Sequence, residues 1–260
     1  MVTTKLTACM VVKNEEQWVW YAIQSVIDYV DALIIFDTGS TDNTKKIIAS
    51  FPHKKIHFEE KGKVNAEKLV HLRNEQIKLV RTPWFLLLDG DEVWPHKSIK
   101  SLLTLLSGIG EAVMGIVVKA RLPLGDLYHY QEERAGKYKL LGKTGHYNIR
   151  TYRVKKEYQW KGIYPLEAYV DKKGNAINEQ ESKLVMLKGK EYWHLRHLSR
   201  SAKRGFKREV GERQYVLLPE VFFEERPTQG PSPWVHFSVN DVFISQILTP
   251  LRKMKRNRGI

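Results

Sequence analysis

The chain has 260 residues, and its 42% hydrophobic and 11% aromatic content is ordinary for a globular protein. Its 43 Lys and Arg against 29 Asp and Glu give a net charge of +14, which indicates an anionic partner without choosing between nucleic acid, anionic lipid and a phosphorylated substrate. The single cysteine, Cys9, excludes an intramolecular disulfide, and no stretch approaches the roughly 18 apolar residues of a membrane-spanning helix.

The first hundred residues alternate apolar runs with helical patterns. The runs predict buried strands over residues 6–12, 33–36 and 84–88, and a half-buried strand over 55–59. The predicted helices lie between them: one capped by Asn14, one that ends at Phe51 before Pro52, and one over 64–80. Such an alternation is typical of an α/β fold with a doubly wound, parallel sheet.

The stretch 84–92 is the centre of this pattern, because five apolar residues end abruptly in Asp89, Gly90, Asp91 and Glu92. Open α/β sheets bind ligands beyond the carboxyl ends of their strands, where these acids are expected to lie. Asp89 and Asp91 can point into the same space and share one hard cation, and oxygen-only ligation suits Mg²⁺ or Mn²⁺. The alternative is a solvated turn, since turns favour Asp and Gly.

Beyond Glu92 the pattern is less regular. A helix is expected from Pro95 through Leu106, a strand over 112–120, and a mobile loop over the polar, Gly-containing residues 121–145. The remaining expectations are two strands within 147–160, a hydrophilic hairpin or insertion over 171–182, a strand over 184–195, a basic helix over 199–218, and an apolar helix with a basic tail after Pro227.

Four segments together resemble the family-2 glycosyltransferases with the GT-A fold. They are Val11-Val12-Lys13-Asn14-Glu15-Glu16, Asp37-Thr38-Gly39-Ser40-Thr41-Asp42-Asn43-Thr44, Arg73-Asn74 and Leu87-Leu88-Asp89-Gly90-Asp91-Glu92. The resemblance implies a Rossmann-like, mostly parallel sheet flanked by helices, with a less regular acceptor-side region. We therefore expect a GT-A domain over 1–200, with a nucleotide-sugar half (1–110) and an acceptor-side half (111–200), followed by a basic helical extension (201–260).

The resemblance also implies roles for single residues. The nucleotide sugar would be lined by Val12, Asn14, Glu15, Asp37, Arg73, Asp89 and Gly90. Asp37 would meet the base or the ribose, although a helix cap is its other interpretation, and Asp89 and Asp91 would be the metal-binding DxD pair. A late histidine completes the metal shell in the wider fold, and of His194 and His197 we favour His197 because it is nearer the strand end.

The expected general base is Glu167, which follows the turn Trp160-Lys161-Gly162. Related enzymes often have a histidine before this glutamate, where this chain has Leu166; an ordinary exposed glutamate is the other interpretation. Glu132 and Glu133 are the next candidates. Of the cations on the third helix, Arg73 would order Asp89 or a phosphate, whereas Lys68 is expected on the solvated surface.

The resemblance thus predicts a metal-dependent, inverting transferase that moves a sugar from a nucleoside-diphosphate donor, a UDP-sugar above all, to a hydroxyl of a glycan or lipid-linked acceptor. A nucleotidyltransferase is one alternative, but Lys13-Asn14-Glu15-Glu16 lacks the Gly-rich basic loop that such enzymes place after the first strand. A nucleic-acid-binding protein is another, but it would want cations where this chain has carboxylates.

The terminal segments predict the location of the protein. The N-terminus lacks the apolar length of a signal peptide, which predicts a cytoplasmic protein. An apolar face over 234–248, followed by the basic residues 252–258, suits an interfacial helix on an anionic bilayer. A peripheral position on the cytoplasmic membrane face is therefore expected as well, and a helix packed on the domain is the alternative.

Overall fold

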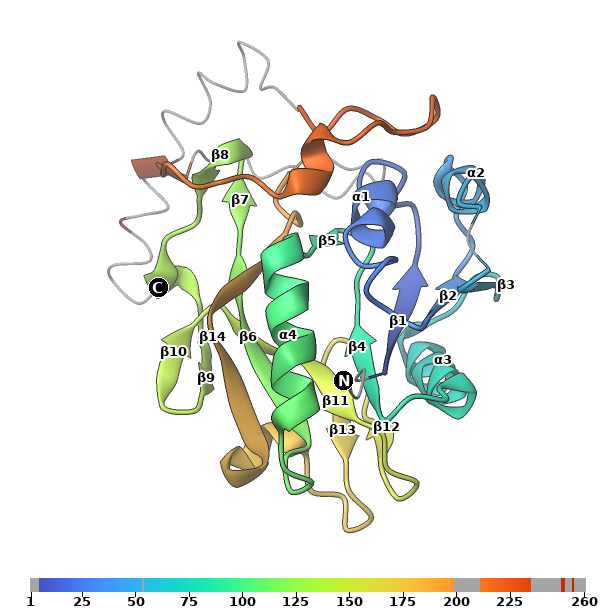
Figure 1. Ribbon diagram of the computed structural model, residues 1–260, viewed down its shortest axis with the longest axis vertical. Coiled ribbons are helices and arrows are strands. Elements are labelled where there is room, and N and C mark those ends of the chain that lie inside the picture. The colour runs from blue at the N-terminus through green and yellow to red at the C-terminus, as the bar shows by residue number, and fades with distance from the viewer. Residues whose placement is uncertain (1–4, 53, 199–210, 235–248, 251–253, 255–260) are drawn as a thin grey trace.

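The computed structural model describes residues 5–52, 54–198, 211–234, 249–250 and 254. An eight-stranded sheet forms its centre, in the order β3-β2-β1-β4-β11-β6-β14-β5 (Figure 1). The strands are β1 (Leu6–Val12), β2 (Ala32–Asp37), β3 (Ile56–Glu60), β4 (Trp84–Leu87), β5 (Glu92–Val93), β6 (Gly115–Arg121), β11 (Tyr147–Arg153) and β14 (Leu184–His194). The mixed α/β architecture that the sequence predicts is confirmed.

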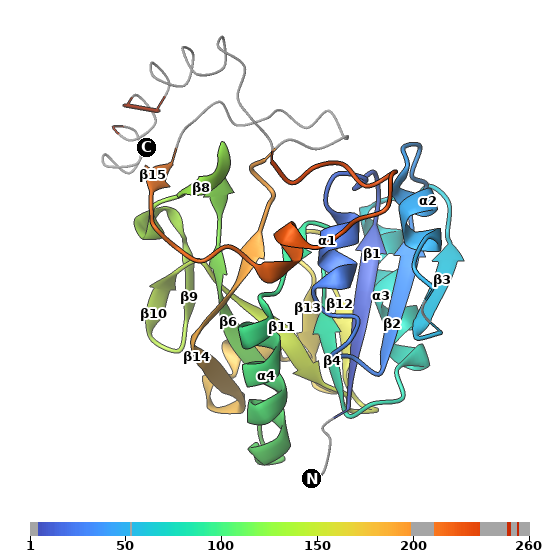
Figure 2. The same ribbon diagram turned by 45° about the horizontal axis from the view of Figure 1, so that its top comes forward.

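The first four strands in the chain form the parallel part of the sheet. β1 pairs in parallel with β2 and with β4, and β2 pairs in parallel with β3, so the four arrows point the same way in Figure 2. The connections carry α1 (Val19–Gln24), α2 (Thr44–Ala49) and α3 (Ala66–Leu79). The carboxyl ends of β1, β2 and β4 therefore meet at one edge, as the buried apolar runs predict.

Alternating side chains of the strands face two separate hydrophobic cores. On β1, Met10 contributes to the core that also includes α1, α2 and α4 (His96–Gly108), whereas Cys9 contributes to the core that includes α3. β4 divides in the same way, with Leu86 in the first core and Phe85 in the second. Both faces of the central strands are thus covered, which is why these strands lack polar alternation.

The second half of the chain completes the sheet with mixed strand directions. β11 runs antiparallel to both β4 and β6, β14 is parallel to β6, and β5 pairs with the end of β14. In Figure 1, α4 lies in front of β6 and β14. Short hairpins surround this part: β7 (Pro123–Leu124) with β8 (Asp126–Tyr130) and β15 (Glu212–Arg213), β9 (Tyr138–Leu140) with β10 (Lys143–Gly145), and β12 (Gln159–Lys161) with β13 (Ala168–Val170).

Two expectations for this half are wrong. Residues 121–145 are not one long loop, because they contain β7 to β10 and bury Leu124, Leu127, Tyr130 and Leu140. These buried side chains are spaced too irregularly among polar residues to produce a recognisable period. The described part of the expected basic helix, residues 211–218, is not helical, since it holds β15 and then an irregular segment.

The N-terminal cap predicted at Asn14 is also wrong. α1 begins at Val19, and Asn14 has a positive φ of 54°, so the chain turns sharply there before the helix. Asn tolerates this left-handed conformation better than most residues. The Asn14 carboxamide oxygen instead accepts a hydrogen bond from the backbone N–H of Thr41.

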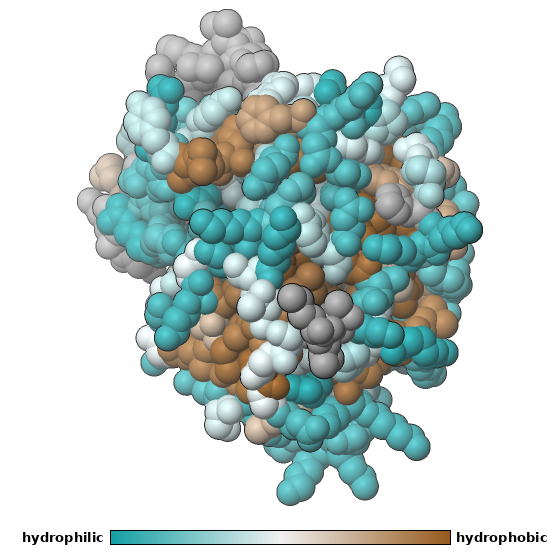
Figure 3. Space-filling view, viewed as in Figure 1, coloured by the Kyte–Doolittle hydropathy of each residue, from teal (hydrophilic) through white to brown (hydrophobic). Residues whose placement is uncertain are grey.

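The apolar and basic C-terminal segments that the sequence analysis singled out, 235–248 and most of 252–258, lie outside the described residues. Within the part that the structure describes, none of the helices combines the length and the apolar character that crossing a bilayer requires. Figure 3 shows a strip of hydrophobic residues near the top of the molecule, where Figure 1 draws the segment after β15. Within that segment, the side chains of Leu217 and Phe223 are exposed.

Candidate active site

The turn between β4 and β5 holds the acids predicted from the sequence and packs against the end of β1. A Cβ atom on Gly90 would lie 3.0 Å from Glu15 Cγ and 3.3 Å from Val12 Cγ2, so only glycine fits without displacing them. The turn is closed by a hydrogen bond from the Glu92 backbone N–H to the Asp89 carbonyl. Three of the residues predicted to line the nucleotide sugar, Val12, Glu15 and Gly90, are thereby in one place.

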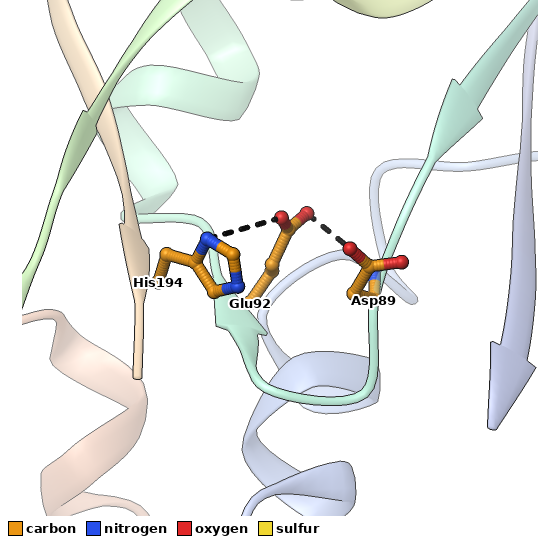
Figure 4. Close-up of side chains that lie close together, drawn as sticks. All are labelled: Asp89, Glu92 and His194. Carbon is orange, nitrogen blue, oxygen red and sulfur yellow. Dashed lines mark hydrogen bonds and ion pairs between the residues drawn. The ribbon is translucent and has the colours of Figure 1, made fainter. Parts of the chain in front are cut away.

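His194 at the end of β14 joins these acids, because β14 pairs with β5 opposite Glu92. One ligand atom from each of Asp89, Glu92 and His194 lies within 4.8 Å of the others, and Figure 4 shows the three side chains facing one another. Asp91 approaches the same ring from its other nitrogen, with Oδ2 3.5 Å from His194 Nε2. Two carboxylates and an imidazole are a donor set that could hold a divalent metal.

Burial controls the charge of this cluster. It lowers the pKa of His194 to about 3, with the nearby Arg150 charge acting in the same direction, so the imidazole is neutral and keeps a lone pair for a metal. Burial raises the pKa of Glu92 well above its ordinary value, and the Arg150 charge opposes that rise. A divalent cation at this position would favour the ionised form of Glu92.

Arg150 is a residue of this site that the sequence analysis did not identify. Its Nη2 lies 3.2 Å from Asp89 Oδ2 and forms an ion pair with Glu92 Oε1. Its Nε donates a hydrogen bond of 3.2 Å to the Tyr192 hydroxyl oxygen. The run Tyr147 to Trp160 predicts strands but gives no sign that an arginine in one of them turns toward the acids. The sequence analysis names Glu92 as the third acid of the turn but assigns it no role.

The loops after β1 and β2 form the neighbouring part of the site. Asp37 is fully buried; its Oδ1 accepts hydrogen bonds of 2.9 Å from the backbone N–H groups of Gly39 and Ser40. Its Oδ2 is buried and has no hydrogen-bond partner among the residues that the structure describes. Thr44 Oγ1 accepts a hydrogen bond from the Glu15 N–H and ties the two loops together. Asp37 shapes the turn before α2, whereas Asp42 accepts the Thr44 N–H.

Arg73 and Glu167 form a second charged pair, which joins α3 to the segment before β13. Arg73 Nε lies 3.1 Å from Glu167 Oε1, and both side chains are less than 10% exposed. The guanidinium carbon lies 5.5 Å from the centre of the Trp160 ring, and Asn74 hydrogen-bonds to the backbone N–H and carbonyl of Trp160. Glu167 Oε2 is buried, and none of the described residues forms a hydrogen bond with it. Burial raises the pKa of the nearby Tyr152 to about 12, and the charge of Arg73 opposes that rise whereas the charge of Glu167 adds to it.

Four other residues singled out from the sequence are not members of this three-residue cluster. His197 lies in a turn three residues after β14 ends and is not one of the three clustered side chains. Lys68 is exposed on α3. Glu133 lies 2.5 Å from Lys119 Nζ, and Glu132 forms an ion pair with Arg134.

Comparison with known proteins gives a consistent result. The model of the family described as "Glycosyl transferase family 2" matches residues 7–168. A TPR repeat-containing protein of Synechococcus elongatus is 34% identical over 88 residues, which are 34% of this chain and 21% of that protein.

Two solved structures illustrate the structural likeness. S. aureus TarS 1–349 in complex with UDP-GlcNAc has a TM-score of 0.51 at 13% identity, covering 79% of this chain and 63% of that one. Mycobacterium tuberculosis glucosyl-3-phosphoglycerate synthase in complex with Mn²⁺ and UDP-glucose has a TM-score of 0.35 at 24% identity, covering 46% and 44%. The chain thus spans about a fifth of the curated relative and less than two thirds of either solved chain.

Proposed function

We propose that this chain, which belongs to glycosyl transferase family 2 and is a glycosyltransferase, transfers a sugar from a UDP-sugar to an acceptor hydroxyl with a divalent cation and inversion at the anomeric carbon. The observation that carries the proposal is the cluster of Asp89, Glu92 and His194 within 4.8 Å, at the carboxyl edge of a parallel sheet. That edge is where open α/β sheets bind nucleotides.

The donor nucleotide would lie over the ends of β1 and β2. Asp37 Oδ2 is a buried carboxylate oxygen without a hydrogen-bond partner in the described part of the chain, and a uracil N–H or a ribose hydroxyl would satisfy it. TarS, which shares the fold, was solved with UDP-GlcNAc, and this makes uridine the first nucleotide to test.

The residues at the β4–β5 turn fit a divalent cation such as Mn²⁺ or Mg²⁺. Asp89, Asp91 and Glu92 carry three formal negative charges against the single charge of Arg150, and a neutral His194 adds a nitrogen ligand. Asp89, Glu92 and His194 would hold the ion, and Asp91 would orient the imidazole from its other nitrogen. When bound, the cation supplies Lewis-acid stabilisation of the departing diphosphate.

Glu167 is the proposed general base. The acceptor oxygen attacks the anomeric carbon, the bond from that carbon to the diphosphate oxygen breaks, and its electron pair leaves with the diphosphate. The proton of the attacking hydroxyl passes to Glu167; Arg73 holds its Oε1, and its Oε2 is buried with no hydrogen-bond partner within the described ranges. Glu132 pairs with Arg134 in the same way, and Glu167 is preferred because it occupies the place at which the family resemblance expects the base.

We further propose a glycan or lipid-linked acceptor, and a cytoplasmic protein that can lie on the anionic face of a membrane. The basic residues of 252–258 support this location. Sedimentation with anionic liposomes at low and high salt tests it. Salt-sensitive binding that disappears when residues 250–260 are deleted is expected, and equal sedimentation of both proteins would contradict it.

The transferase activity is tested by incubating the protein with UDP-, GDP- and dTDP-sugars and Mn²⁺ and measuring the nucleoside diphosphate that is released. We expect UDP release that EDTA abolishes and that an acceptor glycan increases. A nucleotidyltransferase would release pyrophosphate from a nucleoside triphosphate instead. Absence of nucleoside diphosphate release from every donor, with Asp37 and the cluster intact, would contradict the proposal.

A further inference from the structure

Arg150 lies at an irregularity of β11 that turns it toward the acids. In the pairing of β11 with β6, Ile149 is opposite Val117 and Thr151 is opposite Ile116, so Arg150 is an extra residue without a partner on that strand. On its other side, Thr151 is opposite Leu86 of β4, which places Arg150 beside the end of β4. Such bulges occur next to active sites, where they redirect a side chain.

The Arg150 guanidinium is held by Tyr192 as well as by the acids. Its Nε donates to the Tyr192 hydroxyl, which also accepts a hydrogen bond of 2.9 Å from Asn148 Nδ2. The guanidinium carbon lies 5.4 Å from the centre of the Tyr192 ring, and that ring stacks on Trp94. Tyr192 and Trp94 are fully buried. This support holds a positive charge at one place in the site.

The Arg150 guanidinium contacts the residues that would bind the candidate cation. One nitrogen, Nη2, contacts carboxylate oxygens of both Asp89 and Glu92, and the same Glu92 oxygen lies 3.9 Å from His194 Nδ1. Arg150 therefore contacts the same carboxylates that would bind the divalent cation. Two cations so close repel each other, and in a buried site that repulsion is only weakly screened.

We infer that Arg150 is a positioning residue that weakens binding of the divalent cation in the absence of donor and so makes tight cation binding depend on the nucleoside diphosphate. The diphosphate brings negative charge into the site and offsets the repulsion between the two cations. A guanidinium also suits phosphate oxygens, to which it can donate two hydrogen bonds. The inference rests on the proposed function, because it assumes that the Asp89 cluster holds a cation.

Titration of the unmodified protein and of Arg150→Met with Mn²⁺, followed by calorimetry or by the electron paramagnetic resonance of free Mn²⁺, tests the inference. Methionine keeps much of the bulk but neither charge nor donors. Without UDP we expect Arg150→Met to bind Mn²⁺ at least about tenfold more tightly than the unmodified protein. With UDP the difference should shrink, because the unmodified protein gains more Mn²⁺ affinity from UDP than the variant does.

Arg153→Met is the matched control. It removes the same charge from the same strand, but Arg153 donates to the carbonyls of Val113 and Gly110 and stacks over Trp84, away from the acids. Its Mn²⁺ affinity should remain that of the unmodified protein. Circular dichroism establishes that each variant is folded, and Arg150→Lys, which keeps the charge, provides a second variant expected to bind Mn²⁺ about as weakly as the unmodified protein.

The outcomes separate the inference from the function on which it rests. The inference is overturned if a folded Arg150→Met leaves the cation-to-UDP coupling unchanged, or if it binds Mn²⁺ no more tightly than the unmodified protein does. In both cases the proposed transferase stands. If the unmodified protein binds no Mn²⁺ even with UDP, the proposed cation site itself is wrong.

Discussion

The two halves of the sheet differ in the regularity of their strands and in the hydrophobic side chains that they expose to solvent. The strands of residues 6–93 are mostly parallel and, apart from the partly exposed β3, buried on both faces, whereas those of 115–198 run in mixed directions with several short hairpins. Every exposed large hydrophobic side chain among the described residues lies in or after the second region: Tyr128, Tyr138, Ile163, Tyr164, Leu166, Tyr215, Leu217, Phe223 and Met254.

The candidate site is divided between these halves. The first half supplies negative charge, from Asp37 and from the acids of the β4–β5 turn. The second half supplies their partners, Arg150 and His194, together with the proposed base Glu167. We infer that the first half binds the donor, and that the second half modulates the affinity of the cation site and binds the acceptor. The following predictions test that division.

The largest effect is expected from Asp89→Asn, which removes a charge from the donor side. The proposed cation loses a ligand, and loss of several kcal/mol of leaving-group stabilisation corresponds to a rate lower by about 10³-fold. Turnover of a UDP-sugar at saturating Mn²⁺ is the measurement. Asp28→Asn, an exposed aspartate of the same half, should keep full turnover. Near-normal turnover of Asp89→Asn would contradict the assignment of this half.

A smaller effect, on the acceptor side alone, is expected from Glu167→Gln. Glutamine keeps the shape but cannot accept the proton, so kcat should fall by about 10²-fold while the affinity for UDP stays the same. Steady-state kinetics with an acceptor and calorimetry with UDP measure the two quantities separately. The control is Glu157→Gln, which lies in an exposed turn before β12. A loss of UDP affinity in Glu167→Gln would place Glu167 on the donor side and contradict the proposed division of the site.

Asp37→Asn should affect donor binding by a still smaller factor. Asparagine can keep the hydrogen bonds from the Gly39 and Ser40 N–H groups, but it replaces the free Oδ2 by an NH₂ group that cannot accept. Losing a hydrogen bond to a charged group costs about 1.5–3 kcal/mol, so UDP affinity should fall by about tenfold or more. Calorimetry with UDP measures this change. Unaltered UDP affinity would leave Asp37 as a residue of the turn only.

The sequence predicted the first half better than the second for a physical reason. Strands buried on both faces are continuous apolar runs, and parallel strands bring their carboxyl ends to one edge, so Asp37 and Asp89 could be placed from the sequence alone. In the second half several strands are short and pair with distant segments, and the pattern of residues 121–145 predicts a loop where the structure has β7 to β10. Strand pairing over such separations leaves no local period to recognise.

The partners of the acids depend on that long-range pairing. Arg150 reaches Asp89 because β11 carries an irregularity opposite β6, and His194 reaches Glu92 because β14 pairs with β5. Neither fact can be seen in the sequence around these residues. Arg73 was expected to order Asp89 or a phosphate; its ion pair in the structure is with Glu167, and the guanidinium beside Asp89 belongs to Arg150.

The smallest effect is expected from Leu166→Ala, next to the proposed base. Leu166 is 87% exposed, and its neighbours Ile163 and Tyr164 are exposed as well, so the leucine contributes little to the folded core. The free energy of unfolding should therefore change by no more than about 0.5 kcal/mol, measured by urea denaturation.

UDP affinity should not change in Leu166→Ala, because the residue belongs to the acceptor half. If the acceptor covers this apolar rim, its KM should rise by about fivefold at most, which corresponds to about 1 kcal/mol of buried apolar contact. Since an exposed leucine is replaced without loss of fold or donor binding, a change in acceptor KM alone would show that the second half meets the acceptor beside Glu167. A change in UDP affinity of the same size would instead mean that the donor extends across both halves.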